Sequence, residues 1–195
     1  MSRIIDFLYL KNSKIKLKGY VTSPEINIDN FTNTGKSTDT SEFMLPGNIE
    51  ALLDVSFDNL KCDKFKAGDF MMTVQYFYPE LTVKKYSFRS MKGKVEGQAE
   101  ISAVEDRKIL VKNACRLSSI AIDEMFRSLN NFGQDYIMDK HLKGSVNADI
   151  SLSGIWDSCM RLAGKYLDVE GSVEILNGEL IDFGQIGRAS CRERV

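Results

Sequence analysis

Apolar and polar residues alternate one for one along much of the chain. The clearest runs lie at residues 49–58, 70–76, 81–88, 95–101 and 109–117, and short polar turns separate most of them. Period-two alternation predicts strands that have one apolar and one hydrated face. The short connections predict that consecutive strands pair in an antiparallel meander.

The N-terminal part carries a weaker version of the same pattern. Residues 15–28 alternate around Ile15, Leu17, Ile26 and Ile28, which predicts two strands parted near Pro24. Residues 32–44 are small, polar and aperiodic, which is typical of a linker. The predicted organisation is therefore N-terminal strands in residues 1–31, this linker, and a main β region in residues 45–185.

A single amphipathic helix is expected over residues 123–140. Asp123 is the expected N-cap, and Gly133 weakens the middle and indicates a kink. The residues expected along its apolar stripe are Phe126, Leu129, Phe132 and Ile137.

After the helix the alternation returns. The apolar positions on one predicted face are Val146, Ala148, Ile150, Leu152, Val169, Val173 and Ile175. Asn177-Gly178 is a favoured hairpin turn, so residues 180–183 are expected to begin a return strand. The fold predicted from all of these segments is mainly β: an antiparallel meander curled into a groove or half-barrel, with the helix capping or covering it. A two-sheet sandwich is the alternative.

Composition narrows the classes of function. A net charge of −1 with mixed signs argues against binding of nucleic acid. No apolar run approaches the length of about 20 residues that a membrane-spanning helix needs. The opening "MSRIIDFLYL" is too short and too quickly polar for a signal peptide.

The last ten residues, "IGRASCRERV", differ from the rest of the chain and look like the translation of a sequencing adapter. We therefore expect residues 186–195 to be an artefactual tail and the natural protein to continue differently after Gln185. Without this tail, which holds three Arg and one Glu, the net charge changes from −1 to −3. The cysteines then left are Cys62, Cys115 and Cys159, whose spacing forms no metal-binding pattern and which are expected to be small buried apolar residues.

Candidate catalytic chemistry is weak. "TGKST" at residues 34–38 lacks the earlier glycine of a nucleotide-binding loop, because Asn30 stands at that position. His141 has no metal-ligand neighbour at the required spacing and is expected to cap the helix C-terminus. Trp156 is expected to be a core residue. With no nucleophile and base at a useful spacing, we expect no enzyme activity, no cofactor, no metal site and no nucleotide.

Two segments together resemble a known family. The helix followed by "LKGSVNADISLSG" and then "LDVEGSVEILNGELIDF" is similar to the C-terminal region of AsmA-like envelope proteins, which belong to the AsmA/TamB type. Upstream, "SPEINIDNF" and "LPGNIEALLDVSFDNLKCDKFKAGD" are similar to the segment that precedes that region. The resemblance covers roughly residues 15–183 and is strongest to the versions from Bacteroidetes-type bacteria.

The resemblance implies a role in outer-membrane biogenesis. Proteins of this family are thought to be anchored in the inner membrane and to hold phospholipid acyl chains in an apolar periplasmic β-groove for lipid transport. It therefore implies a phospholipid partner and contact with the envelope membranes through parts outside this chain. On this reading the seven apolar positions after the helix line the groove. The alternatives are a structural β module, without ligand, that assists outer-membrane protein assembly or targeting to the membrane, and a glycan-binding sandwich.

Overall fold

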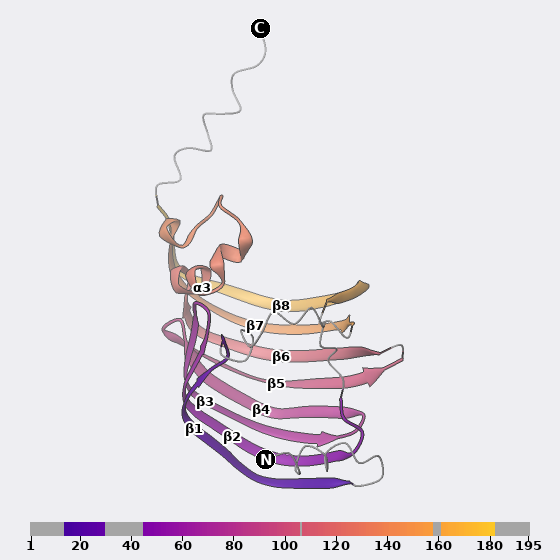
Figure 1. Cartoon of the computed structure of the whole chain (residues 1–195). Helices are drawn as coiled ribbons and strands as arrows, with labels where there is room; N and C mark the ends of the chain where they lie inside the picture. The colour runs from indigo at the N-terminus through magenta and orange to yellow at the C-terminus, as the bar shows by residue number, and fades with distance from the viewer. Residues whose placement is uncertain (1–13, 30–44, 106, 158–160, 182–195) are drawn as a thin grey trace.

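The computed structural model describes residues 14–29, 45–105, 107–157 and 161–181. In this part of the chain, eight strands form one sheet in which each strand pairs with the strand next to it in the sequence. The strands are β1 Ile15–Asn27, β2 Ile49–Cys62, β3 Phe65–Phe77, β4 Glu80–Ser90, β5 Gly93–Val104, β6 Lys108–Ala121, β7 Leu142–Trp156 and β8 Leu162–Leu180. Figure 1 shows a curved sheet with the helical segments gathered at one end.

This architecture confirms the predicted fold class, a mainly β meander that does not close into a barrel and carries one helix. All pairs from β2 to β8 are antiparallel. Because every described strand belongs to the same sheet, the two-sheet sandwich is wrong for the part of the chain that the structure describes. The glycan-binding reading, which needed that sandwich, loses its structural basis.

The N-terminal segment differs from the prediction. β1 is one continuous strand and runs parallel to β2, so that Ile15 lies beside Ile49. Parallel neighbours require a long connection, and here residues 28–48 supply it. Pro24 does not divide the strand, because a proline is tolerated on an edge strand whose free side needs no N–H donor. The predicted linker, residues 32–44, lies outside the described residues, as does the tail at residues 186–195.

The predicted helix 123–140 is wrong in its length. The helix α3 spans Ile122–Ser128 and is followed by two short 3₁₀ segments, η1 Asn130–Gly133 and η2 Asp139–His141. Asn130, Asn131 and Phe132 have φ angles of 51°, 52° and 53°, which a continuing α-helix cannot contain. Asn enters this left-handed region more easily than most residues, so the Asn-Asn pair ends the helix.

The start of the helix also differs from the prediction. Ala121 is the N-cap residue and makes no side-chain capping bond, whereas Asp123 lies in the first turn. A carboxylate there still interacts favourably with the positive end of the helix dipole.

The predicted hairpin at Asn177-Gly178 is also wrong, because β8 continues through these residues to Leu180. Asn177 has a φ of 52°, and the pairing of β7 with β8 shifts register between Lys143 and Ser145. Gly144 lies at this shift, and a side chain there would lie 2.9 Å from the carbonyl oxygen of Asn177 on β8. Asn177-Gly178 therefore forms an irregularity within the β7–β8 pair, and Gly144 on the facing strand leaves room for its backbone.

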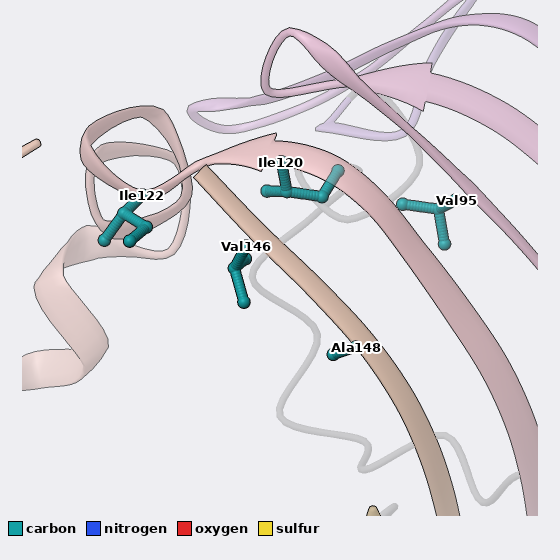
Figure 2. Close-up of a cluster of buried hydrophobic side chains, with 5 residues drawn as sticks. All are labelled: Val95, Ile120, Ile122, Val146 and Ala148. Carbon is teal, nitrogen blue, oxygen red and sulfur yellow. The ribbon is translucent and has the colours of Figure 1, made fainter. Parts of the chain in front are cut away.

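The buried core lies where α3 meets the sheet. Its buried members are Val95, Ile120, Ile122, Val146 and Ala148, drawn in Figure 2. Partly buried side chains from β4, β6 and α3 pack against this cluster, among them Phe88, Met125 and Phe126. This cluster therefore lies at the end of the sheet near α3, whereas other buried apolar side chains, such as Ala51, Tyr76 and Ile109, lie elsewhere in the sheet.

Candidate functional site

The ladder register brings the apolar positions of all eight strands onto one face of the sheet, which we call the apolar face. Val146, Ile120 and Ile175 lie side by side across three strands, as do Leu152, Asn113 and Val169. The second of these rows continues across the sheet to Leu53 on β2 and Gly19 on β1. The apolar side chains of this face on β1 to β5 are Leu17, Val21, Ala51, Leu53, Val55, Phe57, Phe70, Met72, Val74, Tyr76, Leu81, Val83, Tyr86, Phe88, Val95, Ala99 and Ile101.

Two irregularities keep this face continuous. In β4 the register shifts between Val83 and Tyr86, and in β6 it shifts between Leu117 and Ile120. Strict alternation would turn Ser119 toward the apolar side, but Ser119 has a φ of 52° and the strand bulges there. The extra residue rotates the chain, so Ile120 enters the core with no exposed surface.

A row of aromatic rings crosses the apolar face. Phe57, Phe70, Phe88 and Tyr86 stack in sequence, with ring centroids separated by 5.7, 5.9 and 6.3 Å. Such pairs stabilise a sheet beyond the area that they bury. This part of the apolar face is thus held by contacts within the sheet itself.

Tyr86 closes a gap in the apolar face. Its ring lies over Gly97 of β5, and its hydroxyl donates a hydrogen bond of 2.9 Å to Oδ1 of Asn113 on β6. Burial, with a smaller contribution from Cys115, raises the pKa of Tyr86 to about 12. An aromatic side chain over a strand glycine replaces the packing that the glycine lacks.

The opposite, polar face carries most of the charged side chains of the sheet, with a few exposed apolar ones such as Leu52 and Met71 among them. Arg116 donates a 2.7 Å hydrogen bond to Asp149 across the β6–β7 pair, and this partner raises the pKa of the guanidinium. A recess of about 590 Å³ on this side spans β4 to β8, and its lining includes three carboxylates and two lysines. Charged groups of both signs suit water and not an acyl chain, so this recess is not the expected site of a lipid tail.

The seven predicted groove residues all lie on the apolar face, but in three different environments. Val146 and Ala148 are buried in the core under α3, so they are unavailable to a ligand in this conformation. Ile150 and Leu152 are half-buried. On the edge strand β8 the side chains are open: Val169 is 57% exposed, Val173 63% and Ile175 60%.

The residues of the predicted helical stripe do not share one surface. Phe126 packs on the core, and its ring meets Phe132 edge-on at a centroid distance of 5.0 Å. Leu129 and Phe132 are exposed because the chain leaves the helix after Ser128. Ile137 lies between η1 and η2, where its N–H donates to Oε1 of Gln134 at 2.9 Å.

Ion pairs join the helical segments α3 and η2 to each other. Arg127 of α3 donates to Asp139 of η2 at 2.9 Å and to Glu124 at 3.2 Å. The Arg127 guanidinium lowers the pKa of Asp139. His141 accepts a hydrogen bond of 3.2 Å from the N–H of Met138 at its Nδ1 atom, so it caps the start of η2 and not the end of a long helix.

Other candidate chemistry adds little. Within residues 14–29, 45–105, 107–157 and 161–181, no group of His, Cys, Asp and Glu could hold a metal ion. Cys62 and Cys115 are free thiols that are half-buried, whereas Cys159 and the "TGKST" segment lie outside the described residues. Trp156 is half-buried at the end of β7, beside Ile109 on β6.

Sequence reasoning missed most of the apolar face. The seven predicted groove residues lie only on β7 and β8. The same alternation recurs in β2 to β6 and could have added Leu53, Val55, Val74 and Val111 to them. Ile120 and Tyr86 had no such signal, because a bulge precedes each of them.

None of the family models, curated proteins or solved structures compared with this chain matches it. Among the described helices, none has both the length and the apolar character needed to cross a membrane.

Proposed function

We propose that this chain is a module of an AsmA-like envelope protein whose apolar sheet face holds phospholipid acyl chains during lipid transport between membranes. The module would stand on the periplasmic side of the envelope, and the full-length protein would be anchored in the inner membrane. Outer-membrane biogenesis is the process that such transport would serve.

The observation that carries the proposal is the continuity of the apolar face across eight strands without a second described sheet over it. Outside the core under α3, a few of its side chains, such as Ala51, Tyr76 and Val83, are also buried. The others are half-buried or exposed, and the exposed ones gather on the edge strands. Apolar surface left in water costs about 25 cal/mol per Å². Acyl chains would remove this cost, because each buried methylene group contributes about 0.8 kcal/mol.

Two further features favour an elongated apolar ligand. The polar groups of the backbone are paired within the sheet from β2 to β7, so the surface offers acyl chains few unsatisfied donors or acceptors. In Figure 2, Val146 and Ala148 lie on the inner side of the curve that β7 follows, so the apolar face lies inside this bend. The polar face keeps its charged groups in water.

The test uses two matched substitutions on β8. Val173→Asp puts a carboxylate on the apolar face at an exposed site, whereas Ser172→Asp puts the same charge one residue earlier, on the polar face. Binding of a pyrene-labelled phosphatidylethanolamine to the full chain should weaken about ten-fold or more in Val173→Asp, since a desolvated carboxylate is costly beside an acyl chain. Ser172→Asp should bind like the wild type.

Circular dichroism would verify that both variants retain the fold. Equal binding by the two variants would contradict the proposal. A wild-type chain that binds no phospholipid while well folded would instead favour the structural β module without a ligand.

A further inference from the structure

The two edges of the sheet carry opposite charges. On the polar face of β1, the first half of the strand presents Lys16 and Lys18. On the polar face of β8, Asp168 lies in the same ladder row as Lys18, and Glu170 and Glu174 follow it along the strand. In the described part of the chain, β1 pairs only with β2 and β8 only with β7, so one side of each edge strand has no described partner strand.

The two edges also run in the same direction. β1 is parallel to β2, and six antiparallel steps lead from β2 to β8, so β8 is parallel to β1. The ladder partners that follow Leu17 across the sheet are Ala51, Tyr76, Leu81, Ile101, Val111, Gly154 and Leu167. The next row on the polar face starts at Lys18 and ends at Asp168 by the same count.

We infer that β8 of one molecule binds β1 of a second copy, so that copies join edge to edge into a continued sheet. If the ladder rows of the first copy continue into the second, Leu17 of the second copy lies beside Leu167 of the first. Lys18 of the second copy then lies beside Asp168 of the first and within reach of Glu170. The apolar face then continues across the junction, and opposite charges meet on the polar face. Cross-strand pairs of opposite charge stabilise a sheet.

The charges select this arrangement over the two symmetric ones. A β8–β8 dimer would set Asp168, Glu170 and Glu174 against the same carboxylates, and a β1–β1 dimer would set lysine against lysine. Like charges across a strand pair are destabilising. Charged residues on an edge strand usually prevent pairing with another sheet. Here β1 repels a second β1 and β8 repels a second β8, but β1 and β8 attract each other. Such head-to-tail contacts form open chains unless the rotation between copies closes a ring.

The length of the contact is limited on the β1 side. Pro24 has no N–H to donate, so pairing is confined to Ile15–Ser23. On β8, residues 167–175 are all exposed, including Val169, Val173 and Ile175 of the apolar face. The second copy would cover part of the apolar surface that β8 now leaves in water.

The test exchanges the charges of the two edges in the full chain. One variant carries Asp168→Lys and Glu170→Lys, and another carries Lys16→Glu and Lys18→Glu. In sedimentation velocity under reducing conditions, wild type should form oligomers whose size grows with concentration and falls with salt. Each variant alone should need about ten-fold higher concentration to associate, because its two edges then carry the same sign.

Two complementation experiments make the result specific. Mixing the two variants should restore association, and so should combining all four substitutions in one chain. Glu100→Lys on the inner strand β5 is the control and should associate like wild type. A wild type that is monomeric at every concentration would overturn the inference. So would oligomers that persist unchanged in both charge variants, and so would variants that fail to complement each other.

Discussion

The neighbouring strands β7 and β8 show how one alternating pattern produces two different surfaces. Near α3, Val146 is buried with Ile120 and Ile122 in a core filled by the protein's own side chains. On the neighbouring strand β8, Val173 belongs to the same face yet is 63% exposed. The difference comes from the place of each strand: α3 packs against β7, whereas Val173, although it pairs with the buried Ala148, lies on the edge strand (Figure 1). Alternation alone therefore defines an apolar face but does not say what covers it.

The largest expected effect is on the free energy of unfolding, which should respond differently to truncation of a buried and of an exposed side chain of the apolar face. Ile120→Ala should lower the free energy of unfolding by about 2–5 kcal/mol, because it removes a fully buried side chain and leaves a cavity. Val173→Ala should change it by less than about 1 kcal/mol, because that side chain is already mostly in water. Urea denaturation of both variants measures the contrast. Similar losses would mean that β8 is covered in solution.

A second comparison concerns two strand glycines on the apolar face. Gly97→Ala should cost about 1–3 kcal/mol, since the added carbon would meet the carbonyl oxygen of Ala114 and lie 2.7 Å from the Tyr86 hydroxyl. Gly19→Ala on β1 should be nearly neutral, because nothing lies within 4 Å of the added carbon. Thermal denaturation measures both. A neutral Gly97→Ala would show that Tyr86 does not lie over β5.

Alkaline pH should reveal the buried phenol of Tyr86. The pKa of Tyr86 is about 12 in the folded protein against 10.0 ordinarily, so between these pH values the unfolded chain loses this proton first. The contribution of this group is thus complete below pH 10 and is lost as the pH rises toward 12.

Comparison with Tyr86→Phe isolates this contribution from those of other groups. The stability of wild type relative to the variant should fall by on the order of 1 kcal/mol over that range, because solvent screens a half-buried group. Urea denaturation at several pH values gives the difference. A difference that stays constant with pH would contradict the burial of this phenol.

The smallest effect is expected at the ion pairs of the helical segments. Arg127→Gln should lower the free energy of unfolding only slightly, because the pairs with Asp139 and Glu124 are partly exposed and screened by solvent. The pKa of Asp139 is lowered in the folded state, so its contribution is present above the ordinary carboxyl pKa and is lost as the pH falls through the folded value. Urea denaturation near neutral and at acidic pH should show the difference from wild type shrinking in acid. A difference that grows in acid would contradict the pairing.

Much of the sheet could be predicted from the sequence, because alternation is a local property of each strand. Val146, Ala148, Ile150 and Leu152 do share one face, as their spacing predicts. The helix was overestimated because the apolar stripe continues to Phe132 and Ile137 while the Asn-Asn pair ends the helix at Ser128. Local backbone conformation prevailed over hydrophobic periodicity there.

The remainder depends on contacts that no local pattern records. The bulge at Ser119 brings Ile120 into the core. The parallel pairing of β1 with β2 requires the long connection between these two strands. Which apolar residues stay exposed depends on the place of each strand in the sheet. Val173 and Val146 look equivalent in the sequence, but one lies at the edge and the other under α3.

The most direct test of the central claim is mass spectrometry of organic extracts from the full chain, purified without detergent from a bacterial host. If the apolar face holds acyl chains, the extract should contain phospholipid in stoichiometric amount, and Val173→Asp should reduce it while Ser172→Asp should not. A well-folded wild-type protein that yields no phospholipid would contradict the account.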